Sequence, residues 1–81
     1  MRAVKDLVAG LTPEEREVLE KFIALPNSPD IQPEILRLAM RYGDRLEHVT
    51  KRVENTRQQL GMSYDMIQKA IRLELAVTAA R

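Results

Sequence analysis

Helix-breaking residues divide this chain into short segments, each of which has room for little more than one helix. Gly10, Pro26-Asn27-Ser28-Pro29, Gly43 and Gly61 interrupt the sequence, since proline cannot continue a helix and glycine commonly ends one. Between these breaks, apolar residues recur at helical spacings of three and four, and no segment alternates as a strand does. With 81 residues, the length suits one domain. We therefore predict an all-α fold, a small single-domain bundle of four to five helices spanning residues 1–81.

Capping signals give the expected start of the second helix. Thr12-Pro13-Glu14-Glu15 joins an N-cap threonine, a proline at the first helical position and the glutamate of a capping box. Apolar residues follow on one helical face, which predicts a helix over residues 13–25. A shorter helix is expected over residues 2–9, ending near Gly10.

Similar signals mark the remaining helices. Asp30 is expected to cap the third helix, which Gly43 then ends. Asp44-Arg45-Leu46-Glu47 reads as a second capping box, with Asp44 as the cap. After the break at Gly61, Ser63 is expected to cap a last helix over residues 64–79.

Composition excludes many kinds of chemistry. The chain has no cysteine and a single histidine, His48, so we expect neither a disulfide framework nor a metal site. No catalytic constellation or phosphate-binding loop is present, so we expect no enzymatic activity and no cofactor. Neither a membrane span nor a signal peptide is evident, which makes a cytoplasmic location the default expectation.

The most informative stretch is Val53 to Arg72, VENTRQQLGMSYDMIQKAIR. It predicts a helix, a short turn around Gly61 and a second helix, and it resembles the helix-turn-helix of phage repressors and Cro-like proteins. In that motif a glycine at the ninth position, here Gly61, allows the positive φ of the turn. The fifth position is usually small, whereas here it is Arg57, which must snorkel outwards or wedge the helices apart.

The resemblance implies that the second helix of the motif enters the major groove of DNA. Gln68 would then read adenine, while Lys69 and Arg72 would meet guanine or phosphate. The side chains expected to point outwards and bind DNA are those of Ser63, Tyr64, Asp65, Gln68, Lys69 and Arg72.

Two weaker signals accompany the motif. Leu11 to Leu19 resembles the opening helix of the DNA-binding regions of LuxR-type regulators and sigma factors. The segment from Arg37 to Arg72 holds eight basic and four acidic residues, for a balance of +4, although the whole chain carries only +1. Such a basic segment favours contacts with phosphate. The candidate phosphate contacts are Arg41, Arg45, Lys51, Arg52 and Arg57.

These observations predict a small DNA-binding transcriptional regulator of phage or bacterial type, with duplex DNA as its partner. The alternative is a helical protein-interaction module, such as an anti-sigma-like factor, a polymerase-binding factor or an assembly adaptor, with RNA polymerase or a sigma factor as its partner. Arg57 and the near-neutral total charge favour this alternative. A homodimer is also expected, through the apolar tail formed by Leu73, Leu75, Ala76, Val77 and Ala79.

Overall fold

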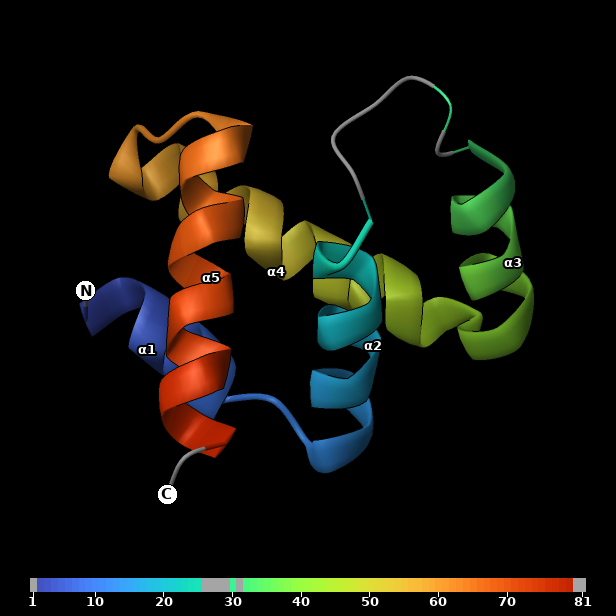
Figure 1. The fold of residues 1–81 in the computed structure, drawn as a ribbon, viewed down its shortest axis with the longest axis horizontal. Helices are drawn as coiled ribbons and strands as arrows, with labels where there is room; N and C mark the ends of the chain where they lie inside the picture. Colours follow the sequence, from blue (N-terminus) through green and yellow to red (C-terminus); the bar gives the residue numbers. More distant parts are fainter. Residues whose placement is uncertain (1, 26–29, 31, 80–81) are drawn as a thin grey trace.

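The longest helix, α4 (Asp44–Leu60), runs along one side of the molecule and contacts each of the other four helices. The computed structural model describes residues 2–25, 30 and 32–79. Its other helices are α1 (Arg2–Ala9), α2 (Pro13–Ile23), α3 (Gln32–Tyr42) and α5 (Tyr64–Ala79). Figure 1 shows α1 and α5 near one end of α4, α2 at its middle and α3 at the other end. Helices and their connections account for the whole described part, which confirms the all-α prediction.

One apolar core joins four of these five helices. Helix α4 presents a stripe at spacings of three and four, as an amphipathic helix does. Helix α3 contributes no buried residue and packs by half-buried side chains only. The core is formed by Val4, Leu7, Val8, Leu11, Val18, Leu19, Ile23, Leu46, Val49, Val53, Ile67 and Ile71.

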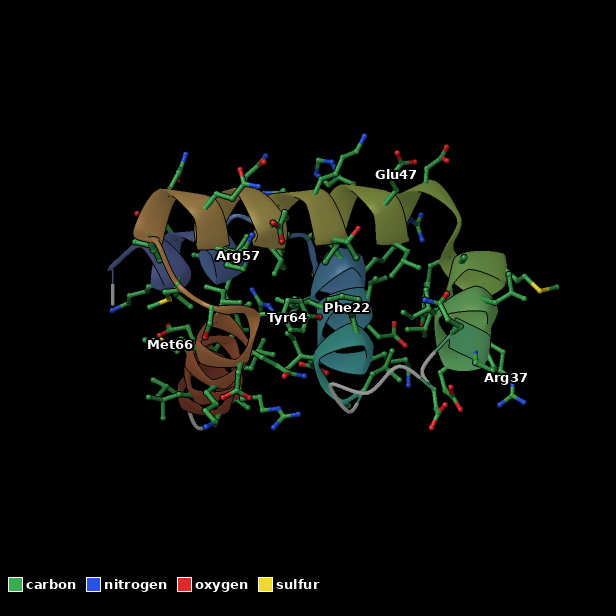
Figure 2. The ribbon with its side chains drawn as sticks, turned by 90° about the horizontal axis from the view of Figure 1, so that it is seen from above. Phe22, Arg37, Glu47, Arg57, Tyr64 and Met66 are labelled. Carbon is green, nitrogen blue, oxygen red and sulfur yellow. The ribbon has the colours of Figure 1, made fainter. Side chains whose placement is uncertain are left out.

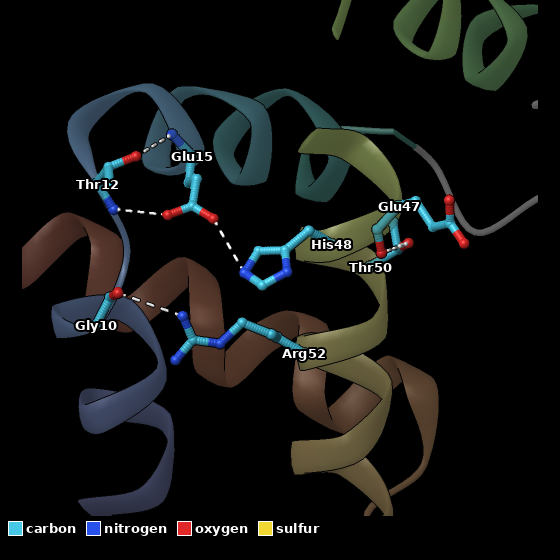
Figure 3. Close-up of polar contacts among 7 residues, drawn as sticks. All are labelled: Gly10, Thr12, Glu15, Glu47, His48, Thr50 and Arg52. Atoms are coloured by element: carbon cyan, nitrogen blue, oxygen red, sulfur yellow. Dashed lines mark hydrogen bonds and ion pairs between the residues drawn. The ribbon is translucent and has the colours of Figure 1, made fainter. Parts of the chain in front are cut away.

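Polar contacts hold the connection between α1 and α2 against α4 (Figure 3). The predicted capping box is present, because the Thr12 N–H donates to Glu15 Oε1 at 3.0 Å and the Glu15 N–H donates to Thr12 Oγ1 at 3.1 Å. From α4, His48 Nε2 lies 3.2 Å from Glu15 Oε2, and Arg52 donates to the Gly10 carbonyl at 3.3 Å. The start of α2 is therefore fixed both by its own cap and by α4.

The prediction that Asp44 caps α4 is wrong. The N-cap is Gly43, with φ +58°, and no side chain caps this helix end. Only this one residue separates α3 from α4, so the chain must reverse there, and glycine reaches that conformation without a Cβ penalty. Asp44 is consequently already helical, and its carboxylate lies in the first turn, where the helix dipole favours negative charge.

Of the other predicted helix boundaries, one differs from the structure, one is confirmed and two involve residues outside the described part. Helix α2 ends at Ile23 with Ala24 as its C-cap, two residues earlier than predicted. Ser63 Oγ accepts the Met66 N–H at 3.2 Å, which confirms the predicted cap of α5. The predicted turn at residues 26–29 lies outside the described residues. Asp30 stands two residues before α3, and the residue between them also lies outside the described part.

Replacing Ile67 by alanine should destabilise the domain by about 2–5 kcal/mol, because a fully buried side chain leaves a cavity. The matched control is Met66→Ala on the adjacent, exposed position, which should change stability by no more than ~0.5 kcal/mol. Urea unfolding followed by circular dichroism measures both values. Equal losses for the two variants would contradict the placement of α5.

Acid should weaken the domain partly through Glu15. The hydrogen bond from the Thr12 N–H, aided by the charges of His48 and Arg52, holds the pKa of this carboxyl below its ordinary value of 4.5. A lowered folded-state pKa stabilises the protein above pH 4.5, and that contribution disappears as the pH falls through the folded value. Thermal unfolding between pH 6 and 3 should therefore show a smaller acid-induced loss for Glu15→Gln than for the wild type. Parallel curves for the two proteins would refute this assignment.

Candidate interaction surface

The turn between α4 and α5 has the backbone geometry expected from the sequence. Gly61 adopts the left-handed conformation, with φ +64° and ψ +27°. Its N–H donates to the Gln58 carbonyl, and the Met62 N–H donates to the Arg57 carbonyl, so two carbonyls in the last turn of α4 have donors from the turn. Figures 1 and 2 show α5 crossing α4 steeply after this turn.

Arg57 is built into the turn. Its Nη1 donates to the Met62 carbonyl at 3.0 Å, and its Nε donates to Glu54 Oε2 at 3.0 Å. The hydrogen bond from Arg57 lowers the pKa of the Glu54 carboxyl and raises that of the guanidinium, so both groups favour their charged forms. The half-buried guanidinium therefore ties α4 to the chain beyond Gly61, and reaching a phosphate would require it to give up these partners.

The expectation that Gln68 points outwards is wrong. Its side chain is only 5% exposed, and its Nε2 donates to the carbonyls of Ile23 and Leu25 at 3.1 and 3.0 Å. One turn later, Arg72 Nη2 donates to the same Ile23 carbonyl at 3.0 Å. Carbonyls at a helix C-terminus have no partner within their own helix, and here α5 supplies the donors.

Tyr64 also lies against α2. Its ring meets Phe22 edge-on, with ring centroids 6.5 Å apart, and burial raises the pKa of its hydroxyl. Figure 2 shows this pair between the two helices. Tyr64, Gln68 and Arg72 are spaced by four residues and so share one face of α5. The motif assigns that face to the DNA groove, but α2 covers it at Tyr64 and Gln68, whereas Arg72 stays exposed while its guanidinium donates to the Ile23 carbonyl.

The other three predicted contacts are exposed on α5 or just before it. Ser63 caps the helix, and Lys69 Nζ pairs with Asp65 Oδ2 at 3.1 Å. Five of the six predicted positions therefore lie on one helix, with Ser63 as its cap, but the structure divides them between an exposed edge and a contact with α2.

The candidate phosphate contacts do not form one basic ridge. Arg41 lies over the Tyr42 ring on α3, at the end of the molecule far from α5 (Figure 1). On α4, Arg45 pairs with Glu14 at 2.8 Å and Lys51 pairs with Glu47 at 3.0 Å. The two remaining candidates, Arg52 and Arg57, donate to the backbone carbonyls described above.

The outer face of α5 is apolar and open. Met66, Leu73 and Val77 are 55%, 68% and 41% exposed, although each carries a large apolar side chain. Together with half-buried Ala70 they repeat at spacings of four, three and four, which places them on one side of the helix. We call these four residues the α5 stripe. Ile67 and Ile71, which are fully buried, lie roughly 110° around the helix from this stripe, and half-buried Leu75 lies on the opposite side.

The sequence identified this surface only in part. Leu73 and Val77 belong to the predicted dimer tail and are exposed, whereas Leu75 of that tail packs against the core. Met66 was not included, although its spacing from Leu73 was a readable signal. Helix α5 has two rows of apolar residues on different sides. The sequence alone does not say which row faces the core and which faces solvent.

The open clefts elsewhere on the surface do not bring together an obvious set of catalytic or ligand-binding groups. One of them has a volume of about 320 Å³ and lies between α1 and α4, with Asp6, Arg52 and Asn55 in its lining. Among the described residues, no three His, Asp or Glu side chains gather closely enough to hold a metal ion. Within the same part of the chain, every helix is too short or too polar to cross a membrane.

Comparison of the chain with protein families, with curated proteins and with solved structures finds no match. The geometry of α5 and its neighbours therefore carries the functional argument.

Removing the Gln68 amide should destabilise the domain. In Gln68→Leu the carbonyls of Ile23 and Leu25 each lose the hydrogen bond from the Gln68 amide, while Arg72 still donates to Ile23. The loss of a hydrogen-bond partner at a buried polar group costs about 1–3 kcal/mol. Lys69→Leu is the matched control, because its exposed ion pair contributes at most ~1 kcal/mol. Chemical denaturation provides both values. A Gln68→Leu protein as stable as the wild type would show that this contact does not hold α5 to α2.

Proposed function

We propose that this domain is a helical protein-interaction module that binds its partner through the α5 stripe. The observation that carries the proposal is the exposure of Leu73, Met66 and Val77 on the face of α5 opposite the core. Scattered exposed apolar residues are ordinary, but a contiguous apolar row marks an interaction site more often. The row spans most of one helix, which is the form of an anchor set for helix-to-helix docking.

The free energy gained by burying its side chain favours Leu73 as the central residue of the interface. Burying a leucine side chain fully is worth about 1.5–3 kcal/mol, and Leu73 is the most exposed member of the stripe. It contributes little to the domain's own core, so its apolar surface is available to a partner. A few such residues carry most of the binding free energy at protein interfaces.

The same surface is poorly suited to DNA. Affinity for DNA comes mainly from cations that neutralise phosphates, whereas the α5 stripe holds no charged group. The Gly61 turn and the steep crossing of α4 and α5 favour the helix-turn-helix prediction, so DNA binding remains the second candidate. For Gln68 and Arg72 to reach a groove, however, they must leave the α2 carbonyls to which they donate.

Photo-crosslinking tests the proposal directly. A benzophenone amino acid placed at position 73 should form a covalent adduct with a protein partner in extracts of the native cells, and adding Val77→Glu should abolish it. The control places the same group at Lys51, an exposed position on α4, where no adduct is expected. Adducts of equal yield at both positions, or none at position 73, would refute the proposal. Retention on duplex DNA, lost in Arg72→Ala, would favour the second candidate instead.

A further inference from the structure

We infer that the partner of the α5 stripe is a second copy of this chain, packed with its α5 parallel to the first about a two-fold axis. The inference rests on the proposed function, since it uses the same surface. It adds the identity of the partner and the direction of the two helices.

The spacing of the α5 stripe is that of a coiled-coil seam. Residues 66, 70, 73 and 77 occupy successive d, a, d and a positions of a heptad pattern. Gln68, which is buried against α2, lies on the side of α5 opposite this seam, so α2 stands on the far side of the helix. Figure 2 shows Met66 on the side of α5 away from Tyr64 and Phe22. The seam itself is therefore on the exposed side of α5, where a second copy can approach it.

Charges beside the seam select the parallel direction. In the same pattern Lys69 is a g position and Glu74 is the e position five residues later, and such g and e residues pair between parallel helices. Two-fold symmetry makes this pair twice, once on each side of the seam. In an antiparallel arrangement Lys69 faces Ala76 of the other copy instead, and neither charge gains a partner.

The length of the seam sets the strength of the dimer. Twelve residues from Met66 to Val77 rise about 18 Å along the helix axis. One helix pair of this length buries less than the ~1,200 Å² of a standard interface, which is typical of weak and transient association. We therefore expect a monomer–dimer equilibrium that depends on protein concentration.

A single thiol tests the direction of the helices. The chain has no cysteine, so Leu73→Cys carries one thiol, and a parallel two-fold seam places the two copies of residue 73 opposite each other. Oxidised glutathione should convert this variant to a disulfide-linked dimer at least tenfold faster than Lys51→Cys on α4. An antiparallel seam places residue 73 opposite residue 70, so fast crosslinking only in a mixture of Ala70→Cys and Leu73→Cys would overturn the parallel arrangement.

Sedimentation equilibrium tests the charge pairs in the chain without engineered thiols. Lys69→Glu should weaken the dimer about five- to tenfold, because two attractive pairs become repulsive. The double variant Lys69→Glu, Glu74→Lys should restore most of the affinity, since it rebuilds both pairs with reversed signs. A loss that the double variant does not recover would overturn the assignment of these pairs.

The two proposals fail in different ways. A chain that stays monomeric up to millimolar concentration would overturn the second copy as partner. A crosslink from position 73 to a different protein would keep the interaction surface while refuting self-association. A crosslinked product of twice the mass of the chain would support both.

Discussion

The carbonyls at the end of α2 determine which face of α5 is buried and which is exposed. A helix C-terminus buried against a neighbour needs donors from outside, and Gln68 and Arg72 provide them from α5. These bonds, with the edge-on contact of Tyr64 and Phe22, set the rotation of α5 about its own axis. Once that rotation is set, Ile67 and Ile71 must face the core and Leu73 must face solvent. The open apolar face of α5 is therefore a consequence of how α2 ends.

Local signals predicted the fold well because they act over a few residues. The capping box at Thr12, the cap at Ser63 and the left-handed turn at Gly61 each depend on neighbours in sequence, and all three are present. The prediction that Asp44 caps α4 was wrong for an equally local reason, namely the short linker between α3 and α4. With a single residue between α3 and α4, Gly43 takes the cap position whatever follows it.

The site was harder to predict because it depends on distant partners. Gln68 has the polarity and spacing of a surface residue, and its acceptors lie more than forty residues earlier in the chain. Arg57 looked like an obstacle to a tight turn, yet its planar donor group satisfies the carbonyl beyond that turn. Both side chains are polar groups used inside the structure, where hydrogen bonds to backbone offset the cost of burial. Nothing in a local pattern distinguishes them from groups that await a ligand.

Helix α3 gives the molecule an uneven distribution of stability. It contains no buried residue, while α4 and α5 share the fully buried core. Segments with few buried apolar contacts open at a free energy far below that of global unfolding. We therefore expect the amide hydrogens of α3 to exchange with solvent through local opening, and those in the buried parts of α4 and α5 to exchange only when the core comes apart. This distribution of burial predicts a stable unit of α1, α2, α4 and α5, with α3 opening separately at the end remote from α5.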